Sequence, residues 1–176
     1  MSELYEGIVF RSPEAVAREA FSGLRSPHRL RLVRLHGAET FGVYRVAGRS
    51  DAFDEEGVLG LAADVSQLAG GPSVAAFYDN SSGVRSATVF RSGALAGKFA
   101  EADERWVPTG ADGYPLPGVE SVPAGDRDPE AEYECARDAI ELALAAAGIA
   151  AEVTGEVLKD AFVYDRAVVV AEARPT

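Results

Sequence analysis

The chain has 176 residues, of which 47% are hydrophobic and 26% are charged, an ordinary composition for one globular domain. It contains a single cysteine, Cys135, which excludes an internal disulfide and a multi-cysteine zinc site. No apolar run approaches the roughly 18 residues of a membrane span, and the acidic N-terminus is unlike a secretory signal. These features predict a cytoplasmic protein that does not enter a membrane.

The formal net charge is −11, and it is unevenly distributed along the chain. Residues 1–50 carry eight basic and five acidic side chains, whereas residues 101–176 carry six basic and 17 acidic ones. A negative field repels phosphate backbones, so we do not expect nucleic-acid binding. Such a field attracts a basic partner, but a surplus of carboxylates also keeps a protein in solution without any partner. Both interpretations stay open.

The chain begins with a strand pattern that is followed by a helix pattern. Residues 4–10 are apolar and rich in β-formers, which predicts a strand. Ser12, Pro13 and Glu14 then supply an N-cap, a proline at the first helical position and a first-turn acid. We therefore expect a helix that begins at Ser12 and closes before Pro27.

A hairpin and a second helix come next. Residues 29–35 and 41–46 have the pattern of two strands joined by a tight turn. Apolar side chains spaced three and four apart between Val58 and Leu68 predict an amphipathic helix, and Gly70 ends it. The order so far is β-α-β-β-α.

Three further strands are expected over residues 74–78, 84–90 and 94–99, joined by short polar turns. The complete order is β-α-β-β-α-β followed by a hairpin meander. This order matches the ferredoxin-like pattern. The predicted fold class is therefore α+β, in a single domain with a ferredoxin-like core.

The C-terminal part begins with residues 107–129, which are rich in proline and glycine and predict a long loop. A helix should then run from Asp128 to Gly148. The β-rich run at 162–164 suggests a strand, and the wholly apolar run at 168–170 predicts a strand inside a sheet. We expect a sheet core over 1–106, the loop over 107–129, and a C-terminal helix and strand over 130–176 packed on the same domain.

The sequence does not predict catalytic residues, a cofactor site or a metal site. His28 and His36 flank the second strand roughly 26 Å apart, too far for one catalytic pair, and we interpret them as surface histidines. Cys135 has acidic sequence neighbours, which favour an unreactive thiol. The carboxylate runs lack the spacing of a calcium loop, and no glycine-rich segment leads from a strand into a helix.

The best candidate for a partner-binding surface lies around the proline-rich loop, because the only tryptophan directly follows an acidic stretch there and Tyr114 lies in the loop. An exposed aromatic beside carboxylates is a good anchor for a basic protein. The predicted partner-binding residues are Asp103, Glu104, Trp106, Tyr114, Asp126, Asp128, Glu130 and Glu134. The alternative is that Trp106 fills the core where the sheet meets the loop.

Arginines on the second strand form a second charged set. Arg29 and Arg31 share one face of that strand, and Arg34 lies further along it. They could form an anion-binding patch. We favour instead internal pairing with the acidic C-terminal part of the chain.

Three functions follow from these patterns. The first is a non-enzymatic acidic protein that binds a basic partner, one concrete form being an immunity-type protein that neutralises a toxin. The second is a small-molecule-binding sensory domain with its ligand between sheet and helices or under the loop. The third is a metal-dependent hydrolase that uses carboxylates such as Asp112, Asp126 and Asp128. The sequence leaves open whether the final strand pairs in its own sheet or across a homodimer.

Overall fold

The computed structural model describes residues 4–46, 55–79, 81, 84–101, 105–106, 122–123 and 139–176. They form a mixed α+β structure around a seven-stranded antiparallel sheet, which confirms the α+β part of the predicted fold class. The elements are β1 (Leu4–Arg11), α1 (Glu14–Ser22), β2 (Leu30–His36), β3 (Thr40–Arg45), α2 (Glu55–Ala69), β4 (Ser73–Asp79), β5 (Val84–Arg91), β6 (Ala94–Glu101), β7 (Arg105–Trp106), β8 (Val122–Pro123), α3 (Ala139–Ala146), α4 (Gly155–Phe162) and β9 (Val168–Ala173).

The strand order in the main sheet is β6-β5-β4-β1-β3-β2-β9, and each strand is antiparallel to its neighbours. The hairpin expected from residues 29–46 is β2–β3, and the meander expected from residues 74–99 is β4–β5–β6. Ser92 and Gly93 make the tight turn between β5 and β6 with positive φ angles of 52° and 81°. The short strands β7 and β8 pair with each other in a second sheet.

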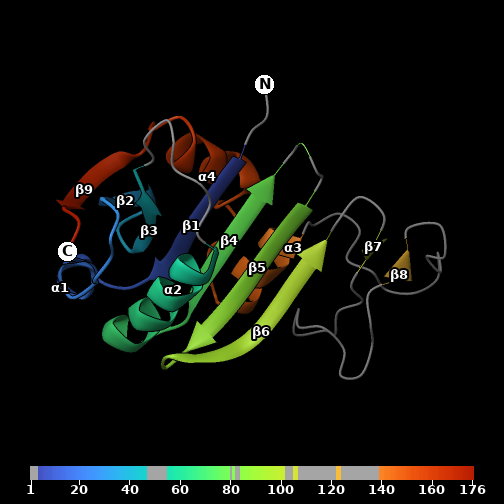
Figure 1. Cartoon of the computed structure of the whole chain (residues 1–176), viewed down its shortest axis with the longest axis horizontal. Helices are drawn as coiled ribbons and strands as arrows, with labels where there is room; N and C mark the ends of the chain where they lie inside the picture. The colour runs from blue at the N-terminus through green and yellow to red at the C-terminus, as the bar shows by residue number, and fades with distance from the viewer. Residues whose placement is uncertain are drawn as a thin grey trace.

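Helices cover both faces of the sheet, with α2 in front of it and α3 behind it in Figure 1. The period of two in a strand sends alternate side chains to the two layers. In β1, Ile8 and Phe10 pack against α1 and α2, whereas Tyr5 and Val9 pack on the side of α3 and α4. The apolar surface of both helical layers is therefore buried against one sheet.

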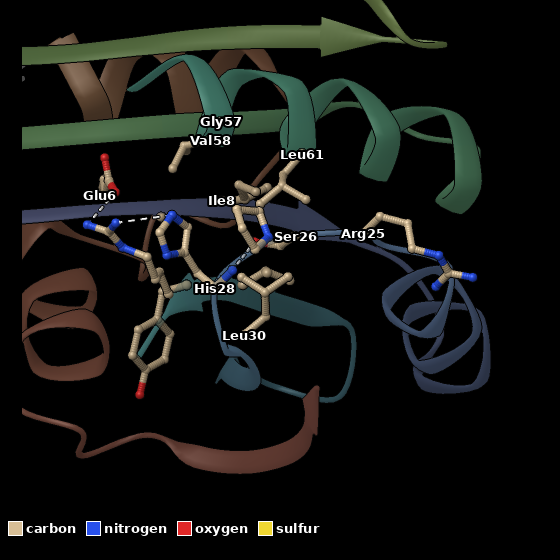
Figure 2. Close-up of a pocket in the computed structure, with 14 residues that line it drawn as sticks. Glu6, Ile8, Arg25, Ser26, His28, Leu30, Gly57, Val58 and Leu61 are labelled. Atoms are coloured by element: carbon tan, nitrogen blue, oxygen red, sulfur yellow. Dashed lines mark hydrogen bonds and ion pairs between the residues drawn. The ribbon is translucent and has the colours of Figure 1, made fainter. Parts of the chain in front are cut away.

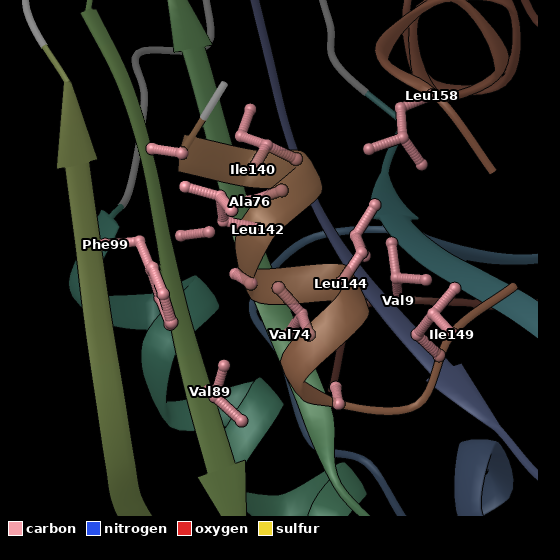
Figure 3. Packing of buried hydrophobic residues seen from close by; sticks show 14 of the residues in the cluster. Val9, Val74, Ala76, Val89, Phe99, Ile140, Leu142, Leu144, Ile149 and Leu158 are labelled. Atoms are coloured by element: carbon pink, nitrogen blue, oxygen red, sulfur yellow. The ribbon is translucent and has the colours of Figure 1, made fainter. Parts of the chain in front are cut away.

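Figure 3 shows the layer behind the sheet, where α3 packs against β5 and β6 and also contacts β4. Ile140 and Leu144 of α3 are almost completely buried, and Phe99 of β6 belongs to the same cluster. Gly148, with a φ of 75°, ends the helix in the left-handed conformation that glycine adopts at low cost. The predicted start of this helix, at Asp128, lies outside the described residues.

Helix α4 corrects one expectation, because the run at 162–164 does not form a strand. Phe162 is the last residue of α4, and Thr154 caps the helix by accepting a hydrogen bond from the Val157 amide at 3.4 Å. The Phe162 ring lies over Gly7 and Gly42, where an added Cβ would come within 2.4 and 2.8 Å of ring atoms. Packing of the Phe162 ring on these two glycines, which have no side chains to fill the space, therefore outweighs the β propensity of residues 162–164.

Two further expectations are wrong. Strand β9 lies at the edge of the sheet beside β2, not in its interior, and its side chains Val168 and Val169 are 63% and 48% exposed. Ser12 does not cap α1, because Pro13 occupies the N-cap position and the Ser12 hydroxyl donates to the Pro13 carbonyl at 3.0 Å. Within the part of the chain that the structure describes, no helix is long and apolar enough to cross a membrane.

Candidate functional site

A cavity of about 90 Å³ lies between the first turns of α2 and the face of the sheet. Figure 2 shows Val58 and Leu61 reaching down from α2 toward Ile8 of β1 and Leu30 of β2. Most of the lining is apolar. Charged and polar side chains gather at one end, and we call Glu6, His28 and Arg45 the buried cluster.

The strand period explains how these residues reach one place. Glu6 precedes Ile8 by two positions in β1, so both side chains lie on the face toward α1 and α2. Arg45 likewise follows Val43 by two positions in β3. Because β1 and β3 are neighbouring antiparallel strands, the register brings the acid and the base to the same end of the cavity.

The buried cluster contains an ion pair inside the protein. Arg45 Nη2 lies 3.4 Å from Glu6 Oε1, and the two side chains are 8% and 6% exposed. Arg45 Nη1 lies 3.5 Å from His28 Nε2. The imidazole of His28 therefore lies beside the guanidinium group of Arg45 at the polar end of the cavity.

Hydrogen bonds within the loop that carries His28, and from this loop to Thr176, hold the loop in place. The His28 amide donates to Ser26 Oγ at 3.0 Å, and the Ser26 amide donates to Thr176 Oγ1 at 3.0 Å. The Thr176 amide donates in turn to the Ser26 carbonyl at 2.9 Å. These bonds fix the wall of the cavity opposite α2.

A second polar group lies on the opposite face of the same strands, and we call Arg31, Tyr44, Asp165 and Glu172 the edge cluster. Arg31 donates to the Tyr44 hydroxyl and to Asp165, both at 3.0 Å, and its Nη2 lies 2.7 Å from Glu172. Tyr44 donates to Asp165. Arg29 also pairs with Glu172, at 2.7 Å. The cluster joins β2, β3 and β9 to the turn before β9.

These contacts shift the titration of three groups. Burial raises the pKa of Tyr44 from 10.0 to about 12, and its donation to Asp165 adds to the effect. The hydrogen bond to Tyr44 raises the pKa of Arg31 above its usual value. The hydrogen bonds from Arg29 and Arg31 lower the pKa of Glu172. Each group therefore keeps the charge state that its bonds require.

The predicted pairing of strand arginines with the acidic C-terminal part is confirmed for Arg29 and Arg31. It is wrong for Arg34, which pairs with Glu14 of α1. The two faces of β2 explain the difference, because side chains alternate between them. Arg29 and Arg31 are two residues apart and share one face, whereas Arg34 is three residues after Arg31 and lies on the face toward α1.

The predicted partner-binding residues fall outside what the structure describes. Trp106 lies in β7, but its side chain is not described. The other seven, Asp103, Glu104, Tyr114, Asp126, Asp128, Glu130 and Glu134, are outside the described residues, as is Cys135. The proposed surface therefore stays a prediction. Among the described residues no three histidine, cysteine or acidic side chains come together as a metal site.

The sequence analysis missed the buried cluster. It treated His28 as a surface residue, whereas His28 lines the cavity; His36 is exposed, with Nε2 4.0 Å from Glu152. A signal was present in the strand pattern. Glu6 occupies the same face of β1 as Ile8 and Phe10, so an acid stands at a core position and requires a partner.

Comparison with known protein families, with curated proteins and with solved structures finds no match for this chain.

Proposed function

We propose that this protein binds a small molecule in the cavity between α2 and the sheet. The observation that carries the proposal is the combination of an apolar hollow with a buried ion pair and an imidazole at one end. Ligand sites are typically apolar clefts with a few converging polar groups that fix orientation. A core that served stability alone would be packed close to crystal density at this point.

A thermal-shift screen with a broad set of small metabolites tests the proposal. A ligand that binds only the folded state raises the melting temperature as its concentration rises. The matched variants are Val58→Phe, which fills the cavity, and Leu68→Phe, which makes a comparable aromatic substitution at an exposed position of the same helix. We expect Val58→Phe to lose the shift and Leu68→Phe to keep it. A screen without any shift, or equal shifts in both variants, would remove the cavity as the ligand site.

We further propose that residues 4–79 form a ferredoxin-like core. The support is the strand order β4-β1-β3-β2 with antiparallel neighbours, and the burial of α1 and α2 in one apolar cluster. Interstrand amide contacts in solution test the assignment. Contacts of β1 with both β3 and β4 are expected, and contact of β1 with β2 would contradict it.

A second candidate function is the binding of a basic protein by the acidic C-terminal part of a cytoplasmic protein, with immunity-type neutralisation as one form. The favouring observation is the charge distribution, with 17 acidic and six basic side chains in residues 101–176. Opposite charges steer association and make it sensitive to salt. We expect capture from native-host lysate, with nuclease treatment, to return one stoichiometric basic partner that is lost as salt rises.

The matched variants for this test carry neutral side chains at different acidic positions. Neutralising Asp103, Glu104 and Glu130 together with Tyr114→Ala should weaken capture. Neutralising Glu19, Glu39 and Glu55, which are exposed and lie outside residues 101–176, should leave it intact. Equal capture by both variants would contradict the predicted surface.

The hydrolase alternative depends on Asp112, Asp126 and Asp128, which lie outside the described residues, and calorimetry with Mg²⁺, Mn²⁺ and Ca²⁺ tests it.

A further inference from the structure

The end of the cavity away from the buried cluster is lined by aliphatic side chains from two layers of the fold. Figure 2 shows Val58 and Leu61 of α2 facing Ile8 of β1 and Leu30 of β2, and Val43 of β3 completes this wall. None of these five side chains carries a hydrogen-bonding atom. A polar group placed among them would lose its hydrogen bonds to water and gain none from them, which is unfavourable. The part of a ligand that lies here is therefore apolar.

The hydrophobic core holds both sides of this wall in place. Ile8, Leu30 and Val43 are at most 3% exposed and belong to the apolar cluster between the sheet and helices α1 and α2. On α2, the buried side chains of Ala62 and Val65 belong to the same cluster. Moving the helix away from the sheet would expose them to water, and close-packed cores resist changes of even one methylene group. The space between the two sides is therefore a firm limit on what can enter.

The volume of the cavity sets the size of the apolar part of the ligand. It measures about 90 Å³. An apolar cavity of about 150 Å³ binds benzene, whose ring has six carbon atoms. In proportion, the cavity holds about four carbon atoms, which is the size of a butyl or isobutyl group. An aromatic ring is too large for it.

We propose that the ligand inserts a short aliphatic group of about four carbon atoms into this end of the cavity, and that Val58 and Leu61 set the size limit. This inference rests on the proposed function, because it names the chemical class of the group that the same cavity takes. The observations that support it are the aliphatic lining, the small volume and the burial that fixes both sides of the wall.

A series of primary alcohols tests the size limit, because the hydroxyl group stays the same while the apolar body grows. The probes are the unbranched alcohols from ethanol to hexan-1-ol, together with benzyl alcohol, each titrated into the whole protein. Methyl NMR shifts of Ile8, Val58 and Leu61 report binding in the cavity. Affinity should rise about fourfold with each carbon atom up to butan-1-ol and change by less than about twofold from there to hexan-1-ol. Benzyl alcohol should leave the cavity methyl groups unshifted.

Variants that enlarge the cavity test the role of the two α2 side chains. Val58→Ala removes two methyl groups from the wall, so it should admit benzyl alcohol and extend the rise in affinity beyond butan-1-ol. Val168→Ala is the matched control, because it makes the same substitution at a position of β9 that is 63% exposed, and it should keep the wild-type order. Leu61→Ala gives a second enlarged cavity if Val58→Ala does not fold. A folded enlarged variant that still excludes benzyl alcohol overturns the assignment of the size limit.

The outcomes of the wild-type series separate the two levels of the proposal. If affinity keeps rising to hexan-1-ol, or if benzyl alcohol binds in the cavity as tightly as butan-1-ol, the size limit is wrong while binding in the cavity is retained. If no alcohol shifts the cavity methyl groups, the inference fails, and the metabolite screen with Val58→Phe decides the proposed function separately.

Discussion

Tyr44 and Arg45 are neighbours in β3, yet they belong to two polar clusters on opposite faces of the sheet. In the edge cluster, Tyr44, Arg31 and the carboxylates of Asp165 and Glu172 contact one another directly across segments far apart in the sequence. In the buried cluster, Arg45 contacts Glu6 and His28 beside an open volume. On one face of these strands, the members of the edge cluster bond to one another. On the other face, the buried cluster lies at one end of a cavity.

If the cavity binds a ligand as proposed, the difference separates a structural role from a binding role. In the edge cluster Tyr44 is buried and the carboxylates of Asp165 and Glu172 are exposed. The cluster joins the edge strand β9 to β2 and β3, so we expect it to contribute to stability. The buried cluster places two charges in the interior, where desolvation offsets much of their attraction. The proposed binding of a ligand in the neighbouring cavity is one purpose that such a cost would serve.

The largest effect is expected from breaking the buried pair on one side. Glu6→Leu should lower the free energy of unfolding by about 3–5 kcal/mol, because the guanidinium of Arg45 stays buried without its carboxylate. The double variant Glu6→Leu with Arg45→Met should recover most of this loss, since both charges are then absent. Urea unfolding of the single and double variants measures the coupling. Losses that simply add would show that the pair is not the source.

Phe162→Ala should lower the free energy of unfolding by about 2–4 kcal/mol. The expected loss is smaller than for a fully buried phenylalanine, because the ring is partly exposed. Its ring lies 5.3 Å from that of Tyr44 and covers Gly7 and Gly42, so its removal opens a cavity next to the edge cluster. Tyr164→Ala is the matched control, because that ring is 41% exposed and should contribute less than 1 kcal/mol, roughly the effect of a surface substitution. Equal losses in the two variants would contradict the packing seen around Phe162.

Tyr44→Phe should cost about 1–2 kcal/mol, because it removes the hydrogen bonds to Arg31 and Asp165. The folded pKa of Tyr44 is raised from 10.0 to about 12, so its contribution is complete below pH 10 and is lost as the pH rises toward 12. The difference in stability between wild type and Tyr44→Phe should therefore shrink over that interval. Urea unfolding at a series of alkaline pH values measures it, and a constant difference would exclude the linkage.

Local patterns predicted the strands and helices of residues 4–101 well, because each element there agrees with its own surroundings. The period of two in β1, the helical spacing in α2 and the glycine turns at Gly70 and Gly93 all point to the observed structure. The C-terminal part was predicted less well. Helix α4 ends in the β-formers at 162–164, and only the bare glycines of β1 and β3 explain why Phe162 lies in a helix there.

The buried cluster could be predicted only in part. The acid at a core position of β1 was visible in the sequence, and Arg45 shares its strand face with Phe41 and Val43. Pairing the two requires the register of β1 against β3, which no local pattern supplies. The cavity depends further on how closely α2 approaches the sheet, and that distance is a result of packing over the whole face.

The smallest effect is expected from Glu172→Gln at the exposed side of the edge cluster. Glu172 pairs with Arg29 and Arg31 near solvent, where water and salt screen the attraction. The hydrogen bonds from these arginines lower its folded pKa, so its contribution is present above the usual carboxyl pKa and is lost as the pH falls through the lowered value. Wild type and variant should therefore differ at neutral pH and converge in acid, by less than the loss seen for Tyr44→Phe. Unfolding curves at low and at high salt measure this, and a difference that survives high salt would place Glu172 among groups that act inside the fold.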